Sequence, residues 1–171
     1  MARVEVELPE RFPFRTEIPV RISDVNYGGH LGNDAVLSIV HEARVRFLRT
    51  HGWTERDVAG AAFVMIDAAV VYRAEGLYGM VLVVDVAVAD LRSRGCDFVF
   101  RHSDRESGRE IARAKTGIVF MDPASGRVVH APAPFVRAVE AGGAGPAGPG
   151  PACSRGERGR AGCERERRRG T

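Results

Sequence analysis

The sequence has few cysteines and no long hydrophobic segment. Its three cysteines, at positions 96, 153 and 163, are too few and too scattered for a disulfide framework or a zinc site. Charged residues such as Asp67 and Asp85 interrupt every apolar run before it could cross a bilayer. The first residues carry charges where a signal peptide would be apolar. We therefore expect a soluble, cytoplasmic protein that neither holds a metal nor enters a membrane.

Excess positive charge is absent from most of the chain. The net charge is +3, but residues 141–171 contain seven arginines and three glutamates, so the first 140 residues have a charge of −1. This last segment is rich in glycine, alanine and proline and then in arginine and glutamate, a composition that cannot bury a core. We expect one domain at 1–140 and a disordered tail at 141–171. No aromatic residue of the tail could stack on bases, so we expect no nucleic-acid partner.

One long helical pattern dominates the remaining sequence. Apolar residues at helical spacing predict a helix at about 33–50: Val36, Ile39, Val40, Ala43, Phe47 and Leu48. Leu37 and Val45 widen this stripe, so we expect the helix to be covered nearly all round. Gly52 is expected to end it.

Strand-like segments surround this helix. They lie at 16–22, 62–73, 80–91, 97–103 and 110–121, and a short helix is expected at 134–140. Pro19 suggests that the first strand lies at an edge or carries a bulge. The strands after the helix are expected to be joined mostly by hairpins, which implies an antiparallel sheet. The pattern predicts an α+β fold, with a curved sheet wrapped around one central helix and completed by a second copy of the chain.

A polar, glycine-bearing segment at 23–34 leads into the helix. Asn33 or Asp34 is expected to cap the first turn. The backbone N–H groups and the positive end of the helix dipole meet here. Such donors can hold an oxyanion, and one of them contributes roughly 3 kcal/mol to transition-state stabilisation. The alternative is that Gly28, Gly29 and Gly32 only allow the chain to turn.

These features resemble the hotdog-fold thioesterases of the 4-hydroxybenzoyl-CoA thioesterase group. Members of that family show Asp-x-Asp, then Gly-His-x-Asn-Asn, then a helix with Glu-Ala-Arg. The corresponding residues here are Asp24-Val25-Asn26, Gly29-His30-Leu31-Gly32-Asn33 and Glu42-Ala43-Arg44. The resemblance covers about residues 12–140 as a layout. It implies a hotdog homodimer or homotetramer that hydrolyses the thioester of an acyl-CoA or an acyl-carrier protein.

The resemblance also implies roles for individual residues. The N–H of Asn33 or its neighbours would hold the oxyanion, and His30 would polarise a water or the thioester oxygen, or else pack within the turn. We expect substrate contacts from Tyr27, Gly29 and Gly32. The family's second acid, its nucleophile or base, is replaced by Asn26, which can hold a water by its carbonyl oxygen but takes no proton at neutral pH. Gly32 likewise replaces the first Asn of the family's pair.

Three carboxylates could serve as the base. Asp24 lies in the same turn, and its alternative role is to anchor that turn by hydrogen bonds. Glu42 lies on the helix, and its alternative role is an ion pair with Arg46. Asp67 lies on a strand that borders the helix, and the sequence leaves its facing open.

Other classes of function find little support. The chain has no phosphate-binding glycine loop after a strand and no nucleophile elbow, so we expect no cofactor. The motif of hotdog dehydratases is absent too. A non-catalytic module that binds acyl groups or CoA remains an alternative because of Asn26. Basic residues on the later strands could meet CoA phosphates or be ordinary solvated positions: Arg92, Arg94, Arg101, Arg113 and Lys115.

Overall fold

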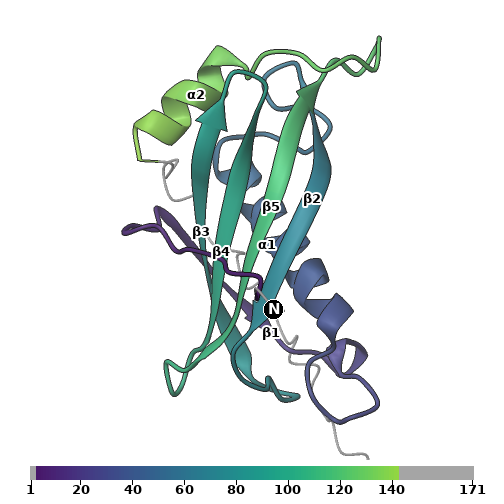
Figure 1. Cartoon of the computed structure of the whole chain (residues 1–171), viewed down its shortest axis with the longest axis vertical. Helices are drawn as coiled ribbons and strands as arrows, with labels where there is room; N and C mark the ends of the chain where they lie inside the picture. Colours follow the sequence, from purple (N-terminus) through teal and green to yellow (C-terminus); the bar gives the residue numbers. More distant parts are fainter. Residues whose placement is uncertain (1–2, 143–171) are drawn as a thin grey trace, which may run out of the picture.

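The computed structural model describes residues 3–142, and the remainder of the tail, with Cys153 and Cys163, lies outside the described residues. One antiparallel sheet curves around a long helix (Figure 1), as the sequence predicts. The elements in chain order are β1 Phe14–Pro19, a 3₁₀ turn Ile22–Asp24, α1 Asn33–Thr50, β2 Ala62–Tyr72, β3 Val81–Arg92, β4 Gly95–Asp104, β5 Glu110–Met121 and α2 Ala133–Glu140.

The sheet has the strand order β1-β3-β4-β5-β2. The chain turns directly from β3 to β4 and from β4 to β5, and these two hairpins are confirmed. The connection from β2 to β3 is not a hairpin, because β2 pairs with β5 and β3 pairs with β1 and β4, so the strands after the helix are joined mostly by hairpins, as expected. A period of two identifies a strand but says nothing of its neighbour. Pro19 ends an edge strand, where its missing N–H costs no ladder hydrogen bond.

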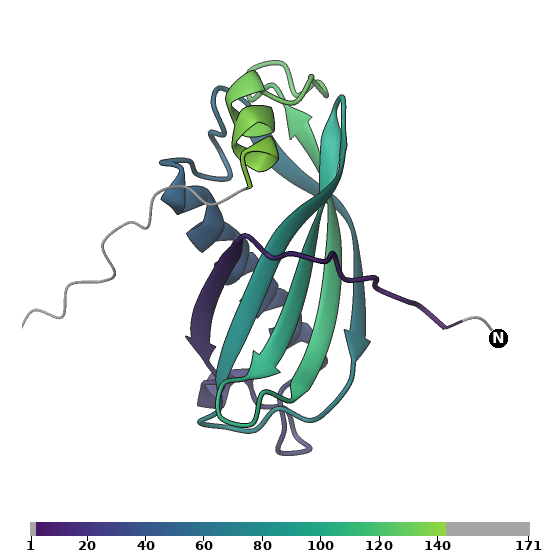
Figure 2. The same cartoon turned by 90° about the vertical axis from the view of Figure 1, so that its left-hand side faces the viewer.

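Helix α1 lies across the concave face of the sheet (Figure 2). Eight of its 18 residues are buried, whereas β4 buries seven of its ten. Ser38, His41 and Glu42 form an exposed ridge, and Leu37 and Val45 beside it are only half-buried. In the single chain the sheet therefore covers one face of the helix, and the expected cover of the rest by a second copy stays a prediction. The helix is an ordinary amphipathic one with one face on the sheet.

The sequence predicts the C-terminal end of α1 correctly but not its N-terminal cap. Gly52 has φ 75°, and the N–H of Trp53 donates to the carbonyl of Leu48, so the expected glycine stop is confirmed. The expected cap by Asn33 or Asp34 is wrong, because Gly32 occupies the N-cap position and makes no side-chain capping bond. A Cβ at Gly32 would lie 2.7 Å from Oδ1 of Asp34, so a larger residue here would displace the Asp34 side chain.

Aromatic rings close one end of the core. Phe47 of α1 contacts Phe98 edge-on at 5.6 Å between centroids, and Phe120 contacts Phe135 of α2 at 5.1 Å. Phe63 lies between these pairs, 5.8 Å from Phe98 and 5.2 Å from Phe120. The short terminal helix thus covers this end of the sheet (Figure 1). The opposite end, where α1 begins, carries the polar turn instead of rings.

Candidate active site

The turn before α1 is held by backbone hydrogen bonds on both sides. Val25 and Leu31 form an isolated β-bridge, and the N–H of Gly32 donates to the carbonyl of Asp24 at 2.8 Å. The N–H of Leu31 donates to the carbonyl of Gly76 at 2.8 Å. A Cβ at Gly76 would lie 3.1 Å from Cβ of Leu31, so glycine allows this close approach. The turn is therefore fixed against the segment that follows β2.

Asp24 is buried at the base of the turn, with 6% of its surface exposed. Its carboxylate accepts from the N–H of Arg21 at 2.8 Å and from the Arg21 guanidinium at 3.2 Å. Burial alone would raise the pKa of Asp24, but the hydrogen bonds and charge of Arg21 outweigh it and hold the pKa below its usual value. These contacts are those of an anchor, and a carboxylate of low pKa is a weak base. Its catalytic role stays a prediction.

Asn26 and His30 face each other across the exposed part of the turn. The amide oxygen of Asn26 accepts from the N–H of Gly28 at 2.9 Å, and its amide nitrogen lies 3.4 Å from Nδ1 of His30. An amide oxygen has two lone pairs, so one remains for a water. The amide oxygen of Asn26 can therefore hold a water on the exposed side of the turn.

A cavity of about 270 Å³ opens where α1 begins. Its lining includes His30 and Asn33, together with Tyr72, Arg73 and Glu75 from the end of β2 and the segment after it. The hydroxyl of Tyr72 donates to the carbonyl of Asn33 at 3.0 Å. The N–H groups of the first helical turn have no side-chain cap. Two predicted site residues, His30 and Asn33, thus meet three residues that sequence reasoning did not single out, beside a helix start that has no side-chain cap.

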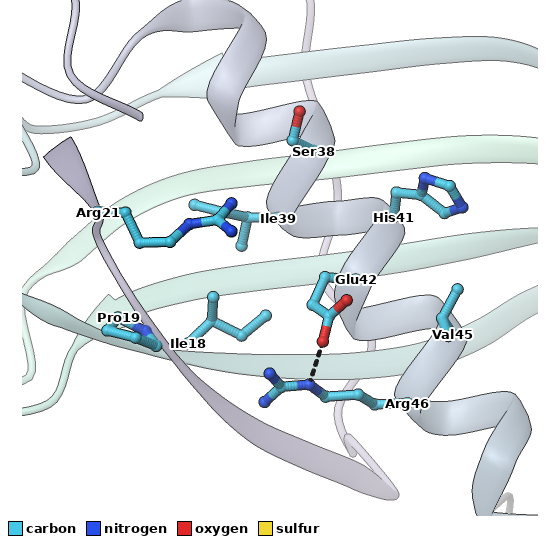
Figure 3. Close-up of a pocket in the computed structure, with 9 residues that line it drawn as sticks. All are labelled: Ile18, Pro19, Arg21, Ser38, Ile39, His41, Glu42, Val45 and Arg46. Atoms are coloured by element: carbon cyan, nitrogen blue, oxygen red, sulfur yellow. Dashed lines mark hydrogen bonds and ion pairs between the residues drawn. The ribbon is translucent and has the colours of Figure 1, made fainter. Parts of the chain in front are cut away.

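Glu42 lies on a different surface of the helix. It lines a cavity of about 320 Å³ with Arg21 and Arg46, between α1 and β1 (Figure 3). Its Oε1 accepts from Nε of Arg46 at 2.7 Å, which is the i,i+4 ion pair that the sequence offered as the alternative role. Arg46 also donates to the carbonyl of Glu17 at 2.8 Å. Glu42 is therefore tied to the β1 edge, and its role as a base stays a prediction.

The remaining predicted residues are spread around the turn. Tyr27 is fully exposed at its tip. Gly29 has φ 83°, a conformation in which a larger residue would be strained. Asp67 accepts from the N–H of Gly117 at 3.1 Å. It lies on the convex face of the sheet because its cross-strand partner Gly117 alternates with the core residues of β5, so it does not face the helix.

Most of the basic residues considered for CoA phosphates are already paired. Arg101 contacts Asp85 at 2.7 Å, Arg113 contacts Glu110 at 2.7 Å and Lys115 contacts Asp97 at 3.0 Å. Arg21 and Arg73, which line the two cavities beside the turn, were missed, because nothing in the sequence pattern shows that distant segments meet there. Only the preference of CoA phosphates for arginine could have drawn attention to them.

Two features that residues 3–142 lack bear on other functions. No group of three or more His, Cys, Asp or Glu side chains among these residues could hold a metal ion. No helix in this described part is long and apolar enough to span a membrane.

Solved structures of thioesterases have the same fold. A 1,4-dihydroxy-2-naphthoyl-CoA thioesterase from Synechocystis is 22% identical, with a TM-score of 0.68 over 74% of this chain and 94% of that one. A putative thioesterase from Pseudomonas aeruginosa is 21% identical, with a TM-score of 0.69 over 75% and 99%. A hypothetical protein from Thermus thermophilus is 26% identical, with a TM-score of 0.67 over 75% and 98%. These structures confirm the hotdog fold.

Sequence comparison identifies the family. No curated protein matches the chain. The family model of the Thioesterase-like superfamily matches residues 20–139, which include the turn, the helix and every strand of the sheet except β1. The resemblance first seen in Asp24–Arg44 therefore extends well beyond the turn and the helix. The chain is a hotdog-fold member of the Thioesterase-like superfamily.

Proposed function

We propose that this chain hydrolyses the thioester of an acyl-CoA, or of an acyl group on a carrier protein, at the start of α1. The observation that carries the proposal is the cavity in which His30, Asn33 and Tyr72 surround an uncapped helix N-terminus. A thioester carbonyl placed there would face N–H donors and the positive end of the helix dipole. Hydrolysis would release a free carboxylic acid and a thiol.

The nucleophile in this proposal is water. Asn26 has no basic atom, but its amide oxygen and the ring of His30 can orient a water toward the thioester carbon. The tetrahedral oxyanion is held by the N–H groups at Asn33 and its neighbours. Tyr72 supports this donor set, because its hydroxyl holds the carbonyl of Asn33 and so fixes the first helical turn.

A carboxylate must take the proton from that water. Asp24 is in the same turn, and Glu42 lies along the helix, but both are engaged by arginines. Glu75 is a third candidate, since it lines the same cavity as His30 and Asn33. General-base assistance contributes about 10²–10⁴-fold to rate, so the isosteric amide at the true base should cost about that much in kcat.

The alternative is a non-catalytic module that binds acyl groups or CoA. One observation favours it: the only buried carboxylate of the turn, Asp24, already accepts its hydrogen bonds from Arg21 and Ser23 among the described residues. With Asn26 in place of the family's acid, the turn would then be a rigid clamp for a ligand carbonyl. This reading predicts tight binding of acyl-CoA without turnover.

The proposed assembly is a homodimer joined along β2, from which a tetramer could be built. Strand β2 pairs only with β5, and its exposed residues include Met65 and Ile66, 48% and 61% accessible. An open strand edge with apolar side chains favours pairing with another strand. The β1 edge is shorter and carries Arg15 and Glu17, which disfavour such pairing. The site lies near this edge, since Tyr72 ends β2.

The test is a panel of acyl-CoA esters assayed with a thiol reagent. Wild-type protein is expected to release thiol from at least one ester. Asn26→Asp should raise kcat by restoring an acid, and one of Asp24→Asn, Glu42→Gln and Glu75→Gln should lower it about 10²–10⁴-fold. Binding of acyl-CoA without any thiol release, by wild type or by Asn26→Asp, would refute the thioesterase and support the non-catalytic binding module.

A further inference from the structure

A separate cavity lies on the other flank of α1, toward β2. It has a volume of about 410 Å³, and apolar side chains from three elements line it: Leu37, Val40, Phe63, Met65 and Ile118. Its polar lining residues are Ser38, His41, Arg44 and Glu55. The chemistry proposed above uses none of these residues. An apolar cavity with a few convergent polar groups is the usual form of a small-molecule subsite.

Arg44 is the unusual residue of this cavity. Only 6% of its surface is exposed, and its Nε donates to Oε1 of Glu55 at 2.7 Å. Its Nη1 is buried and has no hydrogen-bond partner within residues 3–142. A buried guanidinium N–H without a partner costs free energy, because it has lost water and gained nothing in exchange. An oxygen atom in the adjoining cavity would remove that cost.

The charges around Arg44 indicate which oxygen fits. Glu55 is shared, since its Oε2 lies 2.7 Å from Nε2 of His41 while its Oε1 accepts from Arg44. The positive charge of Arg44 is therefore already balanced by Glu55. The unpartnered N–H remains a strong donor, but the Arg44–Glu55 pair itself offers no net charge to a second anion. An uncharged acceptor, such as a hydroxyl or carbonyl oxygen, satisfies the donor without bringing unpaired charge into the cavity.

We propose that this cavity binds the acyl part of the substrate and that Arg44 selects acyl groups that carry an uncharged oxygen acceptor on an apolar body. The apolar lining takes the hydrocarbon, and Nη1 of Arg44 donates to the oxygen. The assignment rests on the proposed function for the identity of the ligand as an acyl-CoA. It adds a determinant of specificity on the opposite flank of the helix from Glu42.

The experiment compares matched acyl groups that differ by one oxygen. Non-hydrolysable thioether analogues of CoA, with straight chains of four to ten carbons, are titrated by calorimetry with and without a terminal hydroxyl. A hydrogen bond to a charged donor predicts about 10- to 100-fold tighter binding of the hydroxylated analogue at the length that reaches Arg44. Hydrolysis of the corresponding thioesters is measured in parallel.

Variants separate Arg44 from the rest of the helix. Arg44→Met should abolish the preference and leave binding of the plain analogue within about threefold, while Arg49→Met, an exposed arginine on the same helix, should keep it. Leu37→Trp should fill the cavity and weaken both analogues alike. If Arg44→Met fails to melt cooperatively, Arg44→Lys and Leu37→Trp carry the test, with a reduced preference expected from the lysine.

The outcomes distinguish this inference from the proposed function. Equal binding of the two analogues at every length, or a preference that survives in Arg44→Met, would overturn the role of Arg44. Unchanged binding in Leu37→Trp would place the acyl group elsewhere. A clear preference in binding with no hydrolysis of any thioester would retain the cavity assignment and refute the thioesterase.

Discussion

The two flanks of helix α1 share one backbone but differ in almost every other respect. The flank toward β1 carries the exposed pair Glu42–Arg46, whose arginine reaches on to Thr16 and to the carbonyl of Glu17. The flank toward β2 carries the pair Arg44–Glu55, with Arg44 buried and one of its N–H groups unpartnered within the described chain. The polar groups of the β1 flank are solvated and paired. The β2 flank is buried and has a hydrogen-bond donor that no described residue satisfies.

The difference follows from helix geometry. Residues two apart on an α-helix point about 200° apart, so Glu42 and Arg44 of the Glu-Ala-Arg motif cannot converge on one site. A motif that is continuous in sequence is therefore divided between two surfaces. Its glutamate joins the β1 edge, and its arginine enters the space between the helix and the β2 side of the sheet. The comparison predicts that equal substitutions on the two flanks have unequal effects.

The largest difference is expected for a buried carboxylate. Val40 is 1% exposed on the β2 flank, and Val40→Asp should unfold the domain, because an unpaired charge there costs more than about 5 kcal/mol, comparable with total stability. Val45 is half-buried on the β1 flank, and Val45→Asp should cost less than about 2 kcal/mol. Urea denaturation followed by circular dichroism measures both. A soluble, cooperatively melting Val40→Asp protein would mean that the helix face is wrongly assigned.

The next effect concerns assembly. Ile66→Lys adds a charge to the exposed β2 edge and should weaken the proposed dimer by at least about 100-fold, since it removes apolar burial and places a lysine in the interface. Glu17→Lys on the β1 edge is the matched control and should leave assembly unchanged. Sedimentation velocity over a range of concentrations reports the masses. Equal behaviour of the two variants would remove the distinction between the edges.

A smaller effect depends on pH. His102 of β4 is fully buried and leans toward β5, with Nδ1 3.3 Å from the carbonyl of Ala112. Burial lowers the pKa of His102 to about 4. The unfolded chain, with a histidine pKa near 6.5, therefore binds the proton between about pH 6.5 and 4 while the folded chain does not. The free energy of unfolding should fall as the pH falls through this window.

The variant His102→Gln isolates the contribution of His102 to the pH dependence of stability. In urea denaturation, the free energy of unfolding of the wild type should fall by about 2 kcal/mol more than that of the variant between pH 7 and pH 5. Only the wild type has an imidazole that is protonated in the unfolded chain but neutral in the folded one. Carboxylates titrate in both proteins and cancel in the difference. Parallel pH profiles would show that His102 is solvated or paired in the folded protein.

The sequence predicted the helices and strands better than it predicted which strands pair with each other. Helix α1 was predicted at 33–50, the range observed, because its apolar spacing and Gly52 are local signals. The pairing of β2 with β5 depends on contacts about 50 residues apart, which no local pattern records. The single chain leaves part of the helix uncovered, since Leu37 and Val45 are apolar but line cavities instead of filling the core.

The candidate site likewise contains residues that the sequence could predict and residues that it could not. The turn from Asp24 to Asn33 could be read from its glycines and polar residues, and the family match places it among thioesterases. The sequence could not indicate the other lining residues Tyr72, Arg73 and Glu75, because only folding brings the end of β2 to the start of α1. The cap was misassigned for a local reason: the polar side chains of Asn33 and Asp34 fit a capping preference, but both residues are already helical and Gly32 occupies the N-cap position.

The smallest effect is expected at Glu42. Its ion pair with Arg46 is about half exposed, so Glu42→Gln should change the free energy of unfolding by no more than about 0.5 kcal/mol. The same substitution tests whether the β1 flank takes part in the reaction. If Glu42 only pairs with Arg46, kcat is unchanged and the exposed flank is structural, whereas a loss of about 10²-fold or more would make Glu42 the base. Arg46→Gln separates the two readings further. It should cost more stability than Glu42→Gln, because it also removes the hydrogen bonds to Thr16 and to the carbonyl of Glu17, and it should leave kcat intact unless the position of the Glu42 carboxylate matters for proton transfer.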